Sequence, residues 1–406
     1  MNIAEIMNIR FDSTKHNLKI SDLAKANEQF VQWLTEVVFI RDFIYRNPPL
    51  VPGKEFSDAL IIFFDTAIII QMKTKQTKKD IDQWLPKNLN DAIRQLNGSY
   101  RMIKQDLVKR FHNELLGIDI EFDKDKIKNI YGIVVLAIDE NKVSYEKMIQ
   151  KNNIPKIQTI ILSQNDLNLI CQRMTTAIDF LNYFEFRHDL IKLVELFLND
   201  EETTMKNMID QLKYLIPKDK NISQEKSQKT IDIIKSSLTG DILSRSDFQY
   251  GLLVDDMIAR AHDLDECYKN IEDKNKALKI AECLGCLTRD RRIAIGKKLY
   301  EKAIQAKETG LEIFVHLQRP IRQLYIYIYT NKDRASRKEL GEMLTSIAQY
   351  KYDNINVITI ITEPIGLGRS YDYILTEERL YKEGIIIPEE ILKILPELNG
   401  ELIKKI

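Results

Sequence analysis

Three polar residues interrupt an apolar stretch of the sequence, and their types are those that bind a metal ion or take part in catalysis. The sequence FSDALIIFFDTAIIIQMKTK, residues 56–75, carries Asp58 near its start and Gln71 and Lys73 near its end. Burying a carboxylate and an ammonium group costs free energy unless they pair with each other or hold a ligand. A divalent cation would account for the carboxylate, because carboxylate and carboxamide oxygens are ligands of hard cations such as Mg²⁺. These residue types therefore indicate metal-assisted chemistry.

A β-hairpin is the element that would bring the three side chains together. With Asp65 and Thr66 as a two-residue turn, Asp58 lies opposite Lys73, and Leu60 lies opposite Gln71. Alternate residues of a strand share a face, so all three polar groups converge at the open end of the hairpin. The residues alone leave a second interpretation open, in which Asp58 and Lys73 form only a cross-strand ion pair. The other face is expected to be core: Ala59, Ile61, Phe63, Ile68, Ile70 and Met72.

The same residues resemble the PD-(D/E)XK (restriction-endonuclease-like) nucleases, in the Mrr-like variant with a Q-x-K half-motif. Asp58 matches the first acid, QMK (71–73) matches the second half-motif, and DAIRQLNGSYRMIK matches the helix after the core strands. The resemblance covers about residues 20–190. The stretch from FIRDF to QMK is also similar to uncharacterised bacterial nuclease-like proteins associated with defence or mobile-element loci. Gln71 departs from the commoner acid, although a carboxamide oxygen can still bind Mg²⁺.

The resemblance implies a site and a reaction. Asp58, Gln71 and Lys73 would be catalytic, and Mg²⁺ or Mn²⁺ would be held by Asp58, Gln71, the main-chain carbonyl of Met72 and Glu55. Lys73 would orient or deprotonate the attacking water and stabilise charge on the phosphate. Glu28 is a further candidate for an outer ligand. Glu55 and Glu28 also fit a solvated loop acid and a surface helix residue.

A basic region follows the hairpin. Residues 71–110 contain ten basic and four acidic residues, an excess that suits a phosphate backbone. A solvated helix face would explain the same charges. Gln95 and Tyr100 are one residue too far apart for the Q-x-x-x-Y element of RecB-type nucleases. The expected nucleic-acid-binding residues are Lys75, Arg94, Arg101 and Lys104.

Weaker candidates lie in the second half of the chain. TRDRR (288–292) is a basic cluster that fits either nucleic acid or a partner, or a salt-bridged helix. Cys283 and Cys286 form one C-x-x-C pair without a second pair at zinc spacing. GLGRS (366–370) lacks the lysine and the upstream glycine of a phosphate-binding loop, so nucleotide hydrolysis is not expected.

The elements that position these residues indicate an α/β fold. The patterns predict a helix over residues 22–45, the hairpin, a long helix capped by Asn88 or Asn90, and β-branched strands at 130–139 and 157–163. Later patterns predict strands at 323–330 and 355–362 around a helix at 336–350. We expect a restriction-endonuclease-like domain over residues 1–163, a helical region over 164–305 with a polar loop at 214–229, and a small α/β domain over 306–406.

Composition restricts the setting and the partners. The 406 residues contain 60 basic and 60 acidic side chains, so only a local patch could attract nucleic acid. Four cysteines form no disulfide framework, and no apolar run is long enough to cross a membrane. We expect a cytoplasmic protein without membrane contact.

These observations combine into one expected function and two alternatives. The expected function is Mg²⁺-dependent endonucleolytic hydrolysis of DNA, in bacterial anti-phage defence. The first alternative is a catalytically inactive nuclease-like module that binds nucleic acid or a protein partner. The second is an adaptor whose helical middle recruits another subunit. The oligomeric state is open, a homo-oligomer included.

Overall fold

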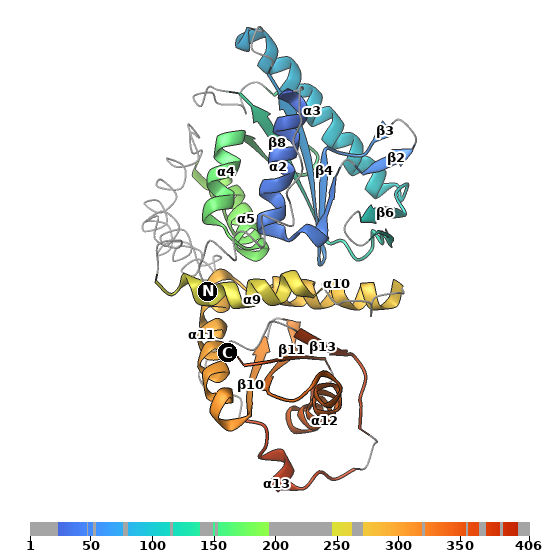
Figure 1. The fold of residues 1–406 in the computed structure, drawn as a ribbon. Helices are drawn as coiled ribbons and strands as arrows, with labels where there is room; N and C mark the ends of the chain where they lie inside the picture. Colours follow the sequence, from blue (N-terminus) through green and yellow to red (C-terminus); the bar gives the residue numbers. More distant parts are fainter. Residues whose placement is uncertain are drawn as a thin grey trace. The chain divides into compact units, whose positions relative to one another are not determined.

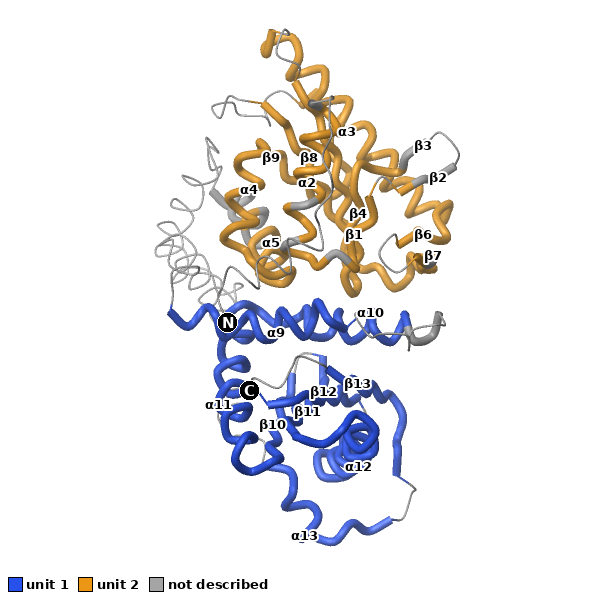
Figure 2. The backbone as a smooth tube through the Cα atoms, viewed as in Figure 1, with its two compact units in different colours: residues 1, 246–406 blue, residues 2–245 orange. Residues whose placement is uncertain are grey.

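A computed structural model describes most of the chain. The described residues are 23–46, 48–51, 54–75, 80–113, 117–138, 149–150, 153–194, 246–261, 271–318, 321–354, 356–364, 371–381 and 385–396. The polar loop expected at 214–229 and the GLGRS segment lie outside them. The chain divides into two compact units, Asn2–Arg245 and Ser246–Ile406 (Figure 2). The helices expected over residues 164–305 are divided between these two units.

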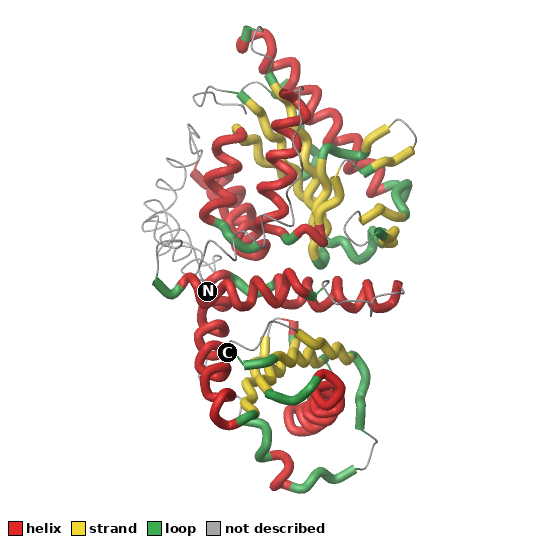
Figure 3. The backbone as a smooth tube through the Cα atoms, viewed as in Figure 1, coloured by secondary structure: helices red, strands yellow, loops and turns green. Residues whose placement is uncertain are grey.

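The first unit is built on a mixed five-stranded sheet in the order β1-β4-β5-β8-β9 (Figures 1 and 3). β1, β4 and β5 are antiparallel neighbours, whereas β5, β8 and β9 run parallel. Its strands are β1 (Ile44–Arg46), β4 (Ala59–Phe63), β5 (Thr66–Thr74), β8 (Asn129–Ala137) and β9 (Gln158–Ser163). Two small ribbons accompany it: β2 (Pro49–Val51) with β3 (Lys54–Glu55), and β6 (Arg110–Asn113) with β7 (Ile118–Glu121).

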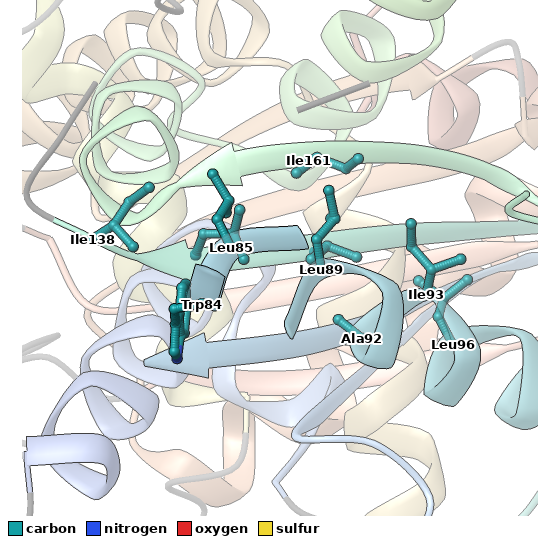
Figure 4. Packing of buried hydrophobic residues seen from close by; sticks show 10 residues of the cluster. Trp84, Leu85, Leu89, Ala92, Ile93, Leu96, Ile138 and Ile161 are labelled. Atoms are coloured by element: carbon teal, nitrogen blue, oxygen red, sulfur yellow. The ribbon is translucent and has the colours of Figure 1, made fainter. Parts of the chain in front are cut away.

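Helices cover both faces of this sheet. α3 (Ile81–Lys104) packs its apolar stripe on one face, where Leu89, Ile93 and Leu96 meet Val134 and Ile161 (Figure 4). The other face is covered by α2 (Leu23–Phe39), α4 (Gln164–Arg173) and α5 (Ala177–Val194). The β-branched strands have almost no exposed residues, as expected for strands buried on both faces. The expected α/β class is confirmed.

The helix bounds differ from the expected ones for local reasons. The first helix ends at Phe39 because Ile40 adopts a left-handed φ of 66°, and Ile44–Arg46 continue as strand β1. α3 begins at Ile81, earlier than Asn88 or Asn90, with the Asp80 carboxylate accepting from the N–H of Asp82 at 3.0 Å. Pro86 therefore lies inside α3. Burial of Trp84, Leu85 and Leu89 offsets the hydrogen bond that this proline cannot donate.

The second unit contains a four-stranded sheet in the order β10-β11-β12-β13. β11 and β12 are parallel and are connected by α12, whereas the outer strands β10 and β13 are antiparallel to them. α12 packs on the face that carries Leu324, Ile326 and Ile328. The described elements are α9 (Phe248–Arg260), α10 (Ile271–Gly285), α11 (Arg289–Thr309), β10 (Leu311–Gln318), β11 (Gln323–Thr330), α12 (Arg334–Tyr352), β12 (Val357–Thr362), β13 (Tyr371–Thr376) and α13 (Glu389–Leu392).

The opposite face of this sheet is aromatic and buried. Tyr325 stacks with His316 at 6.0 Å between ring centroids, and Tyr327 stacks with Phe314 at 5.7 Å. The hydroxyl of Tyr373 donates to the main-chain carbonyl of Met257 in α9 at 2.7 Å. α9 therefore packs on this face. Within the described ranges, no helix has both the length and the apolar composition needed to cross a bilayer.

Candidate active site

The hairpin that carries the expected site has a different turn from the predicted one. Phe64 and Asp65 form the turn, and Phe64 takes a left-handed φ of 55°. Ala59 therefore pairs with Ile70, and Leu60 pairs with Ile69 rather than with Gln71. The predicted register is wrong because the turn lies one residue earlier than expected. The second strand already begins at Thr66, which the prediction placed in the turn. Continued past the last ladder pair, this register puts Asp58 opposite Gln71 rather than Lys73.

The shift moves each partner by two residues and so leaves the faces unchanged. Gln71 and Lys73 share a face of β5 with Ile69, because side chains alternate along a strand. Ile69 packs in a cluster with Ile103 of α3. The Lys73 ammonium donates to the Oε1 of Gln95 in α3 at 2.7 Å. The polar pair of β5 therefore lies on the face that α3 covers.

Asp58 reaches the same part of β5 by a different contact. It precedes β4, is half-buried, and its Oδ2 accepts from the main-chain N–H of Met72 at 2.5 Å. Met72 stands between Gln71 and Lys73, and it is the residue whose carbonyl the sequence nominates as a ligand. The carboxylate thus joins the two strands where their backbone ladder ends, and it holds oxygen atoms beside the Q-x-K segment.

A residue that sequence reasoning missed anchors Asp58 from α2. The amide Nε2 of Gln32 donates to the main-chain carbonyl of Asp58 at 2.9 Å, and it lies 3.4 Å from Oε1 of Glu28. Gln32 is 3% exposed, so its amide forms its hydrogen bonds to protein groups rather than to water. A glutamine among the apolar positions of this helix was the available signal. Through Gln32, Glu28 is connected to the backbone of Asp58.

Gln71 is the most unusual member of the set. Gln71 is 4% exposed, yet its side-chain amide makes no hydrogen bond to any residue that the structure describes. Together with the Asp58 carboxylate and the Met72 carbonyl, its oxygen makes a set of hard donors of the kind that Mg²⁺ prefers. The donor chemistry therefore fits such a cation.

Lys73 does not form the cross-strand ion pair that the residues left open. Its described polar contact is with the neutral amide of Gln95, and Lys73 and Asp58 form no ion pair with each other within the described ranges. A neutral acceptor orients an ammonium group without cancelling its charge. The structure therefore leaves the positive charge of Lys73 available to an anion beside Asp58.

Glu55 is not brought into the hairpin ladder. It lies in β3 and pairs with Pro49 in a separate two-stranded ribbon. Across the described part of the chain, no group of three or more His, Cys, Asp or Glu side chains could hold a metal ion. The carboxylate contact with the Q-x-K segment that the structure describes is that of Asp58 with the main chain of Met72.

The basic residues expected to bind nucleic acid are open to solvent on or near α3. Arg94, Arg101 and Lys104 are exposed, and Lys75 is half-buried at the end of β5. Arg94 forms an exposed ion pair with Asp91 at 3.0 Å. The ammonium of Lys104 lies 5.8 Å from the centre of the Tyr100 ring. Exposed pairs of this kind are weak and leave the charges accessible.

The weaker candidates of the second half of the chain include buried residues of the second unit: Arg289 and Arg292 of the TRDRR cluster, and Cys283. Arg289 and Arg292 of TRDRR are buried against the carboxylate of Asp255 at 2.6 and 2.5 Å, so they form no nucleic-acid surface. Burial raises the pKa of the Cys283 thiol to about 12, and its Sγ lies 3.8 Å from Gln323 Oε1. This thiol is therefore kept protonated and packed.

Neither a scan against protein-family models, nor a search of curated proteins, nor a search of solved structures finds a match to this chain.

Proposed function

We propose that this chain is a Mg²⁺-dependent endonuclease that hydrolyses phosphodiester bonds of DNA. One arrangement supports the proposal: the Asp58 carboxylate contacts the main chain of Met72, between Gln71 and Lys73, while the Lys73 ammonium donates to the neutral amide of Gln95 and the buried Gln71 amide has no described hydrogen bond. The role in bacterial anti-phage defence rests on the sequence resemblance alone.

The residues have distinct parts in the proposed reaction. Asp58, Gln71 and the Met72 carbonyl would hold the cation, which when bound would polarise the phosphate and acidify a water molecule. Lys73 would orient the attacking water and stabilise the negative charge that develops on the phosphate oxygens. Gln95 would fix the direction of the ammonium group while leaving its charge intact. The exposed bases of α3 would hold the phosphate backbone.

A plasmid-nicking assay tests the proposal. The full chain should convert supercoiled plasmid to the nicked form with Mg²⁺ and should lose this activity in EDTA. Asp58→Asn should abolish nicking, because an amide binds the cation more weakly than a carboxylate. Asp65→Asn is the matched control, since Asp65 lies in the turn at the other end of the hairpin. Absence of nicking by the wild-type chain with either Mg²⁺ or Mn²⁺ would reject the enzyme.

A binding module without catalysis is the second candidate, and one observation favours it. The Oδ2 of Asp58 already accepts from the Met72 N–H, so the carboxylate also has a structural use in closing the hairpin. This candidate predicts that wild-type protein binds DNA with a strong salt dependence and never cuts it. Binding and nicking measured on the same preparation separate the two functions.

A further inference from the structure

Packing against the described residues does not explain why a glycine, Gly98, stands in the middle of α3. A Cβ built on Gly98 would meet no heavy atom within 4 Å. Gly132 in β8 is different, because a Cβ there would lie 2.5 Å from Leu96 Cδ1 and 2.7 Å from Thr159 Oγ1. Glycine inside a helix is destabilising relative to alanine, since it loses more backbone freedom on folding. Gly98 therefore carries a stability cost that its own surroundings do not explain.

Gly98 lies in the centre of the outer face of α3. At 3.6 residues per turn, Arg94 and Arg101 lie about 40° and about 60° from it on one side, and Gln95 lies about 60° away on the other. Leu96, which points toward the sheet in Figure 4, is about 160° away from it around the helix. The missing side chain thus leaves open space, here called the notch, at a half-buried position of the helix with two arginines on one side of it.

The charges around the notch fit a polyanion. Arg101 and Lys87 make no ion pair with any residue in the described ranges, and Arg94 pairs only with the partly exposed Asp91. Lys87, Arg94 and Arg101 recur every seven residues and so form a row along the helix. Gln95, one turn before Gly98, holds the ammonium of Lys73. The notch is therefore next to the candidate catalytic lysine.

We propose that the phosphodiester backbone of the bound DNA crosses α3 at Gly98. The absent side chain lets the sugar-phosphate backbone contact the helix directly, while Arg94 and Arg101 neutralise the phosphates on one side of the crossing. The same strand then continues past Gln95 toward Lys73. This inference rests on the proposed nuclease function and adds to it the path of the strand that is cut.

Substitutions at Gly98 test the crossing, because stability and binding should change in opposite directions. Gly98→Ala should raise the melting temperature of the first unit by about 2–4 °C. Both Gly98→Ala and Gly98→Leu should weaken binding of fluorescein-labelled duplex and single-stranded DNA, measured by anisotropy in EDTA so that no cleavage occurs. We expect affinity to fall about tenfold for Gly98→Leu, because the added side chain holds the phosphates away from the helix. Gln83→Leu is the matched control, an exposed α3 position about four turns away.

The outcomes separate the two proposals. Unchanged affinity of both Gly98 variants for a DNA that the wild type binds would overturn the crossing and leave the nuclease proposal standing. Equal losses from Gly98→Leu and Gln83→Leu would also overturn it, because any added leucine would then suffice. Failure of the wild-type chain to bind either DNA would reject both proposals. Higher stability with weaker binding for Gly98→Ala supports the crossing.

Discussion

Two regions of the molecule bury polar groups, and they treat them differently. In the second unit, Asp255 is fully buried and binds the guanidinium groups of Arg289 and Arg292 at 2.6 and 2.5 Å. Arg292 also donates to the main-chain carbonyls of Leu287 and Gly285 at 3.0 Å. At the hairpin of the first unit, Asp58 accepts from the main-chain N–H of Met72, Lys73 donates to the neutral amide of Gln95, and the buried amide of Gln71 has no described hydrogen bond.

The difference separates structural charges from available ones. Buried ions that satisfy one another have no capacity left for a ligand, and removing one of them leaves the others uncompensated. Polar groups that converge without satisfying one another cost stability and can regain it by binding. The sequence marks both regions as charged. Only the pairing distinguishes the core of the second unit from the candidate site.

The largest expected effect is on the paired region. Asp255→Asn should lower the free energy of unfolding by about 3–5 kcal/mol, because it removes the carboxylate that both buried guanidinium groups contact. Denaturant titration of the full chain measures this loss. The triple variant Asp255→Leu, Arg289→Met, Arg292→Met is the control and should lose much less. A loss below about 1 kcal/mol for Asp255→Asn would contradict the distinction between the two regions, because exposed ion pairs contribute no more than that to stability.

A second effect concerns a group of the second unit that is kept neutral. Burial, assisted by Arg291, lowers the pKa of His316 to about 4, and its Nδ1 has no hydrogen-bond partner in the described part of the chain. The unfolded chain binds a proton near pH 6.5 while the folded chain does not, so stability falls as the pH drops below 6.5. We expect a loss of about 2 kcal/mol between pH 7 and pH 5.

His316→Phe provides the control for this titration. The substitution keeps an aromatic ring against Tyr325 and removes the titrating nitrogen atoms. Its free energy of unfolding, measured at the same two pH values, should lack the share of the decrease that His316 causes. Identical pH dependence of the variant and the wild type would show that the titration of other groups controls stability in this range.

At the hairpin the expected stability change is small and the functional change is large. Lys73→Ala removes one partly exposed hydrogen bond to Gln95 and should lower stability by about 1 kcal/mol or less. It should also abolish Mg²⁺-dependent nicking, because the water and the phosphate lose their positive group. Thermal melting and nicking are measured on the same preparation, with Lys128→Ala at the other end of the hairpin as control. A large fall in melting temperature without any wild-type nicking would leave the binding module.

The smallest expected stability change is on the surface of α3. Replacing Arg94, Arg101 and Lys104 by alanine should change the free energy of unfolding by about 0.5 kcal/mol or less. It should lower the slope of log affinity against log salt by about 0.9 for each phosphate that is no longer neutralised, with Arg94 contributing least if Asp91 competes. Lys109→Ala with Arg110→Ala is the control, because both are exposed and paired with acids. Equal slopes for the wild type and the triple variant would place DNA elsewhere.

Continuous β-branched runs could be predicted from the sequence, and strands with mixed composition could not. β8, β9, β11 and β12 consist mainly of apolar residues and have no exposed position, because both faces are buried. β1 was missed because Ile44 and Tyr45 also continue the apolar period of the preceding helix. β10 was missed because Glu312 and His316 interrupt its pattern, and β13 was missed because Asp372 interrupts it. Whether a polar residue within a strand has a partner depends on tertiary contacts, which the local sequence does not show.

The candidate site was predictable to the extent that it is local. Asp58, Gln71 and Lys73 stand out because they interrupt one apolar hairpin. Gln32 and Gln95 belong to helices on opposite faces of the sheet, and only the packing of those helices brings their amides to the hairpin. The hairpin register depends on which two residues turn, and Phe64 is an unusual choice for a left-handed turn position.

The position of β5 in the sheet has a consequence for how the chain folds. Its ladder with β4 joins near neighbours such as Phe63 and Thr66, whereas its ladder with β8 joins Thr66 to Asn129 across all of α3. Closing the short loop costs less chain entropy than closing the long one, so the hairpin is expected to form first. The candidate site would then be assembled before the sheet that buries it. Pulse-labelled hydrogen exchange would detect this order as earlier protection of β4 than of β8, and simultaneous protection would exclude it.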